Sequence, residues 1–171
     1  KTSAGIEVSE QINHYEGRYF IPQFTSFSGG AYMIEKWQHN NWNVSGGLRY
    51  DRKNIHTKRM RYGGEELNHS FHYNNYAASL HVQYRIDTTW RMNIGWTSST
   101  RAPYVNELLS DGIHHSSATY EQGDINLKSE KSFYQGIEIG FRKKKWDISV
   151  TGYFHVIKDF IFRVPVPDSP V

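Results

Sequence analysis

The chain has 171 residues, no cysteine, and 20 basic against 17 acidic residues, which gives a net charge of +3. Disulfides and thiolate metal sites are therefore excluded, and so balanced a charge gives no argument for a nucleic-acid partner. Aromatic residues make up 15% of the chain, yet its mean hydropathy is −0.70 and no apolar run approaches the roughly 20 residues of a membrane-spanning helix.

Alternation of apolar and polar residues predicts β-strands along most of the chain. In chain order the predicted strands are residues 28–38, 41–52, 71–86, 88–99, 128–142 and 146–163. The stretch "GRYFIPQF" within residues 1–27 is a candidate for one more strand. No stretch shows a helical period, so the sequence predicts an all-β, antiparallel fold of about six or seven strands.

Short polar turns alternate with long polar connections between these strands. The turns "QHNN", "DTT" and "KKK" are each followed at once by a tryptophan, namely Trp42, Trp90 and Trp146. The long connections are residues 53–70 and 100–127. Outer-membrane barrels combine short periplasmic turns, long outward loops and aromatic girdles. Because the smallest single-chain barrels have eight strands, we expect a segment of a larger transmembrane β-barrel.

A soluble β-sandwich is the main alternative for the fold, since its strands also alternate. Strand length, the rhythm of the connections and the tryptophan positions favour the barrel. The two interpretations differ in where the apolar face lies. A sandwich would bury Trp42, Leu80, Ile94 and Ile148 against one another in a compact core, whereas a barrel would turn them towards lipid.

Several segments carry a family resemblance. They are "GGAYMIEKWQHNNWNVSGGLRYD", "TRAPYVNELLSDG", a histidine-bearing loop, "YEQGDINLKSEKSFYQGIEIGF" and "WDISVTGYFHVIKDFIF". In this order they resemble the barrel of TonB-dependent outer-membrane receptors over roughly residues 20–163, and are nearest to haem- and metal-uptake members.

The haem-uptake members have two sequence boxes with a haem-ligating histidine between them. The first box is an aromatic residue followed by Arg-Ala-Pro, which Arg101, Ala102 and Pro103 match, although Thr100 replaces the aromatic residue. The second is Asn-Pro-Asn-Leu. Asn126 and Leu127 match its end, but Ile125 stands in place of its proline. Siderophore and zinc receptors also carry parts of both boxes, so the substrate stays open.

The resemblance implies import of haem, an iron chelate or zinc across the bacterial outer membrane, energised through TonB. The expected partners are outer-membrane lipid, TonB and a small iron- or metal-containing ligand. No prosthetic group is expected, because the haem iron, ferric chelate or zinc would be cargo. The plug domain that couples to TonB precedes the barrel in the family, so residues 1–171 are expected to be a partial barrel domain without the plug or the C-terminal strands.

His114 and His115 are the candidate ligands for the cargo, because they lie between the two boxes and neutral imidazole binds both zinc and haem iron. Carboxylates and rings close by in the sequence are candidates for further zinc ligands or for stacking on a flat ligand: Asp111, Glu121, Glu107, Asp124, Tyr104 and Tyr120. A solvated polar surface loop is the alternative. Arg101, Ala102 and Pro103 are interpreted as architectural, because proline ends strand pairing.

The remaining polar residues have more ordinary interpretations. His81 and His155 lie on predicted polar faces and would line the interior of a barrel. His56, His69 and His72 bracket the connection at 53–70, which is expected to be solvated. An outer-membrane enzyme is a second functional class, with Ser110, His114 and Ser116 as nominal catalytic groups, but no acid partner is positioned for them by any motif.

Overall fold

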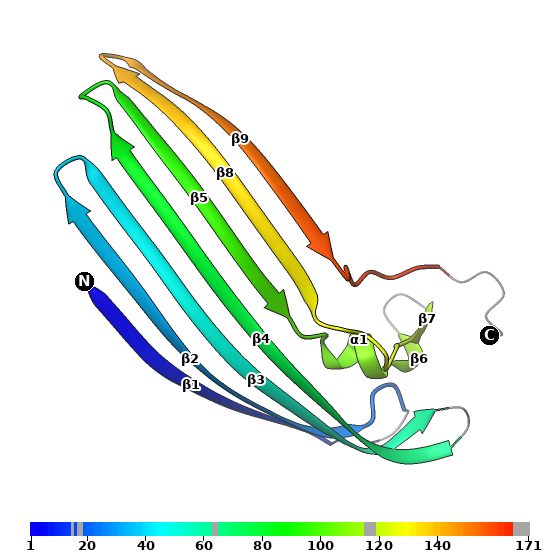
Figure 1. Ribbon diagram of the computed structural model, residues 1–171. Coiled ribbons are helices and arrows are strands. Elements are labelled where there is room, and N and C mark those ends of the chain that lie inside the picture. The colour runs from blue at the N-terminus through cyan, green and yellow to red at the C-terminus, as the bar shows by residue number, and fades with distance from the viewer. Residues whose placement is uncertain (15, 17–18, 63–64, 115–118, 166–171) are drawn as a thin grey trace.

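The structure is a computed structural model that describes residues 1–14, 16, 19–62, 65–114 and 119–165. Within these ranges, seven long strands form one antiparallel sheet in the order β1-β2-β3-β4-β5-β8-β9. The strands lie side by side in a curved sheet, with short turns at one end (Figure 1). We call this the turn end, and the opposite end, which carries the long connections, the loop end. The sheet is part of a β-barrel, as predicted.

The strands are longer than the roughly 5–6 residues usual in soluble proteins. The long strands are β1 (Thr2–Asn13), β2 (Gln23–His39), β3 (Trp42–Tyr62), β4 (Glu65–Arg85), β5 (Trp90–Arg101), β8 (Glu130–Lys143) and β9 (Trp146–Lys158). Between β5 and β8 lie a short helix, α1 (Val105–Leu109), and a small ribbon made of β6 (Asp111–His114) and β7 (Thr119–Gln122). Within the described ranges, no helix is long and apolar enough to span a membrane.

Tight turns close the turn end. Asn40 and Lys144 adopt positive φ angles of 49° and 54° in the turns before β3 and β9. Such angles give two-residue hairpin turns a twist that matches the strands. In the turn before β5, the carboxylate of Asp87 accepts the backbone N–H groups of Trp90 at 2.8 Å and Thr89 at 2.6 Å, and these bonds lower the pKa of Asp87.

Aromatic residues lie at both ends of the part of the sheet that would cross a bilayer, which we call the membrane band. Trp42, Trp90 and Trp146 are the first residues of their strands, as the girdle interpretation predicts. Tyr50 and Tyr76 pair across β3 and β4 nearer the loop end, and both are exposed. The segment from Trp42 to Tyr50 matches the roughly 9–11 residues with which a tilted barrel strand crosses a bilayer.

The register sorts side chains onto two chemically different faces. One cross-strand row contains Trp42, Tyr84, Met92, Ile139 and Val150. The adjacent row, on the other face, contains Asn43, Gln83, Asn93, Glu138 and Thr151. Polar rows are joined by side-chain bonds, such as the 2.9 Å bond from the Asn43 amide to Gln83 and the 3.0 Å bond from the Asn93 amide to Glu138. We call these the apolar face and the polar face.

The apolar face is not covered by a second layer in the described part of the chain. Trp42, Leu80 and Ile148 are 41%, 45% and 50% exposed, and Ile94 is only half-buried. A sandwich core would bury these side chains, so the soluble β-sandwich interpretation is wrong. Such an apolar surface suits the hydrocarbon of a membrane.

Three sequence predictions need correction. Residues 53–70 were expected to form a loop, but β3 and β4 continue through most of this range as a projecting hairpin. The strand expected in "GRYFIPQF" is instead β1, which precedes it. Helix α1 was missed, because five residues are too few to show a helical period. Gly63 and Gly64, at which the sequence predicts a turn because glycine readily takes positive φ, lie outside the described residues.

We predict that Leu80→Arg destabilises the barrel far more than Ser79→Arg. Leu80 lies on the apolar face near the middle of the band, where an arginine facing lipid costs about 2–4 kcal/mol. Ser79, its neighbour, lies on the polar face and is the matched control. Urea unfolding of the receptor in lipid vesicles, followed by tryptophan fluorescence, measures both. Equal losses would contradict the assignment of the faces.

Candidate ligand-binding site at the loop end

The connection between β5 and β8 folds back over the polar face of the loop end. Its helix, α1, buries Leu108 and Leu109 to 1% and 3% exposure. They join a buried apolar cluster, the rim cluster, which also contains Phe24, Ile55, Met60 and Phe71. Since a fully buried leucine contributes about 1.5–3 kcal/mol, this cluster fixes α1 to the sheet. Figure 1 shows α1, β6 and β7 gathered at this end.

The rim cluster follows the same two-residue alternation of side chains as the barrel wall, but here the inward-facing side chains are apolar. Ile55 pairs with Phe71 across β3 and β4, on the face that is polar nearer the turn end. Tyr73, two residues from Phe71 on the same face, donates its hydroxyl to the carbonyl of Leu127 at 3.3 Å. Beyond the membrane band the face that is polar along the wall therefore becomes apolar, and the connection between β5 and β8 packs against it.

Arg101 joins both ends of the connection. Its guanidinium lies 3.0 Å from the carboxylate of Glu107 in α1 and 3.3 Å from that of Glu130, its pairing partner at the start of β8. Glu107 also accepts the backbone N–H of Tyr104 at 2.6 Å, and Glu130 accepts that of Ile161 at 3.2 Å. A planar guanidinium presents several donors in a fixed fork, which suits it to bridging two carboxylates.

The part of the connection that follows β7 is hydrogen-bonded to the backbone of α1 and of the residue after it. The N–H of Gly123 donates to the carbonyl of Ser110 at 2.7 Å, and the N–H of Asp124 donates to that of Glu107 at 3.0 Å. A Cβ atom on residue 123 would lie 2.5 Å from the carbonyl carbon of Leu108, so this close approach requires glycine. The Asp124 carboxylate then accepts the backbone N–H of Asn126 at 2.8 Å and shapes the following turn.

The β6–β7 ribbon presents a mixed surface. Ile113 and Tyr120 are cross-strand partners and are 40% and 48% exposed. The Tyr120 hydroxyl donates to the carboxylate of Asp111. This hydrogen bond, together with partial burial and the negative charge of Asp111, raises the pKa of Tyr120. The backbone N–H of Asp111 also donates to the carbonyl of Phe20 at 2.8 Å, which ties the ribbon to the segment before β2.

The candidate oxygen ligands do not converge. Asp111 pairs with Gln122, and Gly112 with Glu121, so Asp111 and Glu121 lie on opposite faces of the ribbon. Glu121 forms an ion pair with Arg163 at 2.6 Å. No three histidine, aspartate or glutamate side chains among the described residues are grouped so that they could hold a metal. His114 ends β6, but its side chain and the whole of His115 lie outside the described part.

The remaining predicted site residues divide into buried and exposed groups. Tyr104 is 58% exposed, and its ring lies 4.9 Å from the Arg101 guanidinium carbon. Ala102 and Pro103 are buried, which fits their interpretation as architectural residues. Ser110, the nominal nucleophile of the enzyme alternative, is 4% exposed and donates its hydroxyl to the carbonyl of Asn106 at 2.6 Å, an arrangement that does not suit a nucleophile.

Sequence reasoning missed Glu130 altogether and did not recognise Glu107 as a partner of Arg101. A signal for Glu107 was present: it lies three residues after Tyr104, the spacing at which a carboxylate reaches back to the first N–H of a helix. No comparable signal exists for Glu130. Its pairing with Arg101 depends on the register across the whole connection, which the sequence does not contain.

We predict that Arg101→Ala loosens α1 without unfolding the barrel. Both carboxylates would lose their shared partner, so hydrogen exchange at the amides of Leu108 and Ser110 should become about tenfold faster, equivalent to about 1.4 kcal/mol. Amides of β4 serve as the internal control. Arg101→Lys should rescue little, because an ammonium cannot span both partners in fork geometry. Unchanged amide hydrogen exchange in Arg101→Ala would show that Arg101 does not hold α1 in place.

We also predict that Tyr120 ionises at a higher pH in the wild type than in Asp111→Asn. The raised pKa means that the bond stabilises the ribbon below the unfolded tyrosine value of about 10, and that this contribution is lost as the pH rises through the folded pKa. Ultraviolet titration, taken as the difference between each protein and its Tyr120→Phe variant, isolates this residue. Coincident curves would show that the bond does not form.

The sequence matches the protein family described as TonB dependent receptor-like, β-barrel, over residues 4–171. This is a match to the family as a whole and does not separate haem- or metal-uptake members. A comparison with individual curated proteins gave no match. The matched region includes the connection anchored by Arg101 and nearly all of the seven-stranded sheet. The chain belongs to the TonB-dependent receptor-like β-barrel family.

Proposed function

We propose that this chain forms the wall and part of the ligand-binding rim of a TonB-dependent receptor that imports an iron complex, haem or a ferric chelate, with zinc as the alternative cargo. Receptors of this family reside in the bacterial outer membrane and transport substrates with TonB. One observation carries the proposal for this chain: the described parts of the connection between β5 and β8, residues 102–114 and 119–129, are held against the loop end while Tyr104 and Tyr120 stay exposed.

Exposed ring surface on an anchored segment supports a flat or aromatic cargo. Tyr104 is positioned through the contacts of its backbone with Glu107 and of its ring with Arg101. Ile113 and Tyr120 add apolar surface on the ribbon. Side chains that are already ordered lose less conformational entropy on binding, and aromatic faces contact a porphyrin or catechol ring well.

The state of the carboxylates supports an iron complex ahead of zinc. Asp111 accepts from Tyr120, Glu121 pairs with Arg163, Glu107 pairs with Arg101, and Asp124 shapes its own turn. A tight zinc site is built from three or four converging protein ligands, so these contacts would have to break before the connection could form one. Iron in haem or a chelate brings most of its ligands with it, and one imidazole from His114 or His115 would suffice.

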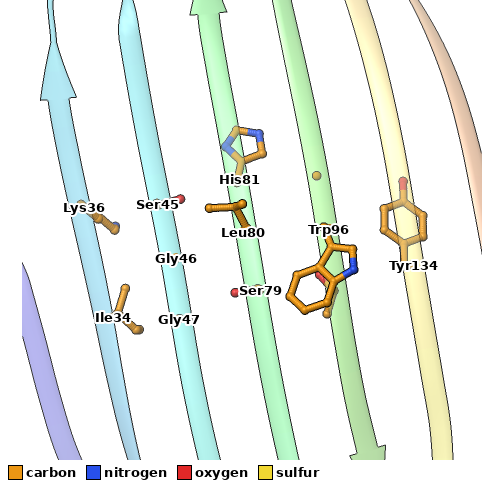
Figure 2. A pocket seen from close by; sticks show the side chains of 12 residues that line it. Ile34, Lys36, Ser45, Gly46, Gly47, Ser79, Leu80, His81, Trp96 and Tyr134 are labelled. Atoms are coloured by element: carbon orange, nitrogen blue, oxygen red, sulfur yellow. The ribbon is translucent and has the colours of Figure 1, made fainter.

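The polar face below the rim supports passage of a polar cargo. Small side chains at Ser45, Gly47, Ser79 and Gly95 leave a shallow hollow of about 230 Å³ on the polar face. Figure 2 shows its lining drawn from neighbouring strands, with Lys36, His81 and Tyr134 among the larger side chains around it. These groups offer hydrogen bonds at intervals along the inner wall rather than one closed pocket.

We predict that the double variant His114→Ala/His115→Ala weakens cargo binding at least about tenfold, or about 1.4 kcal/mol. The intact receptor in detergent would be titrated with haem by absorbance, with ferric chelates by fluorescence quenching, and with zinc by calorimetry. The titration in which the double variant binds more weakly than the wild type identifies the class of cargo. His39→Ala, an exposed histidine at the turn end, is the control.

Tyr104→Ala tests the aromatic contribution separately. Loss of affinity for haem or a catechol chelate in this variant, with Tyr104→Phe retaining it, would support ring contact. If the double histidine variant and Tyr104→Ala both bind every cargo as tightly as the wild type, the connection between β5 and β8 is not the binding site.

A further inference from the structure

Two histidines lie close together on the outward side of the projecting β3–β4 hairpin. His56 pairs with Ser70, and His72 with Asn54, so the two imidazoles are diagonal neighbours on adjacent strands. Their ring centroids are 6.2 Å apart and their planes make an angle of 76°. Both side chains are exposed, on the face opposite Ile55. They therefore lie outside the interior passage and apart from the 102–129 connection.

Each ring is held by its cross-strand partner through the same nitrogen. Nδ1 of His56 lies 2.8 Å from the Ser70 hydroxyl, and Nδ1 of His72 lies 2.8 Å from the amide oxygen of Asn54. An amide oxygen only accepts, so Nδ1 of His72 carries the proton, and a serine hydroxyl can accept in the same way. In the neutral rings Nε2 then carries the lone pair. Within the described residues no other hydrogen bond engages either ring.

We propose that His56 and His72 form a two-histidine site for a divalent transition cation of the zinc and copper class. Metal-binding histidines commonly donate their other ring N–H to a neighbouring acceptor, as His72 does to Asn54 and as His56 can do to Ser70. With metal–nitrogen distances of roughly 2.0–2.1 Å and tetrahedral geometry, two imidazole centroids lie about 5 Å apart. The observed separation of 6.2 Å is about 1 Å longer, so binding requires rotation of the two side chains towards each other, with water in the remaining positions.

The backbone beneath the site is fixed. Ile55, beside His56, is fully buried in the rim cluster, and Phe71, beside His72, is 6% exposed. Both imidazoles therefore project from anchored strands, and only their side-chain torsions need to adjust. A cation bound by one ligand from each strand would also cross-link the hairpin.

The ligand atoms, and not the nearby charges, select the class of cation. Arg52 and Lys58 lie on the same outward face, on either side of the pair along β3. Their positive charge repels every divalent cation, and calcium and magnesium prefer oxygen ligands to imidazole nitrogen. Attraction must then come from the imidazole nitrogens, which favour zinc, copper and nickel.

We expect Zn²⁺ alone to bind at this site in the intact receptor in detergent, measured by calorimetry. The His114→Ala/His115→Ala background removes the candidate loop ligands, so a failure here is distinguishable from a failure of the proposed cargo site. In that background, adding His56→Ala or His72→Ala should weaken zinc binding at least tenfold. His69→Ala is the matched control, because His69 lies on the same hairpin but at an inward position of the register.

Two further measurements sharpen the test. Electron paramagnetic resonance of bound Cu²⁺ should show coupling to two imidazole nitrogens, reduced to one in His72→Gln, which preserves a polar side chain of similar size. Mg²⁺ should give no binding heat. Zinc affinity unchanged by His56→Ala/His72→Ala, or weakened equally by His69→Ala, would overturn the proposal.

Discussion

The structure depends on one constraint: the backbone of every strand must find its hydrogen-bond partners within the sheet, because one face meets hydrocarbon rather than a second protein layer. Long, continuous pairing satisfies this requirement for the strands that lie between β1 and β9 in the sheet. It also forces side chains to alternate strictly, so that Trp42, Leu80 and Ile148 point outwards while Asn43 and Glu138 bond within the polar face.

The same alternation builds the rim once the strands pass the membrane band. The face that is polar along the wall becomes apolar at Phe24, Ile55 and Phe71, and the connection after β5 packs against this surface. Arg101 then bridges Glu107 and Glu130, which ties both ends of that connection together. The described parts of a segment that resembles a free polar loop in the sequence are thus packed against the sheet and can present aromatic side chains.

The opposite side of the rim has a different chemistry. Buried Ile55 and Phe71 alternate with exposed His56 and His72, so the packing that supports the connection also orients two imidazoles away from it. The two proposed sites, one inward for cargo and one outward for a cation, therefore lie on opposite faces of the same strands. This separation follows from the two-residue period of a strand and needs no additional element.

The sequence alone determined the all-β class, the strand faces and the tryptophan positions at the turn end, because alternation and short turns are local properties, while its motifs carried the resemblance to the family. Only the tertiary structure decided that residues 53–70 continue as strands, that Glu130 partners Arg101, and that Asp111 and Glu121 point apart. These features depend on register between segments far apart in the chain. A slip of one residue would move each side chain to the other face, and no local pattern records which register is taken.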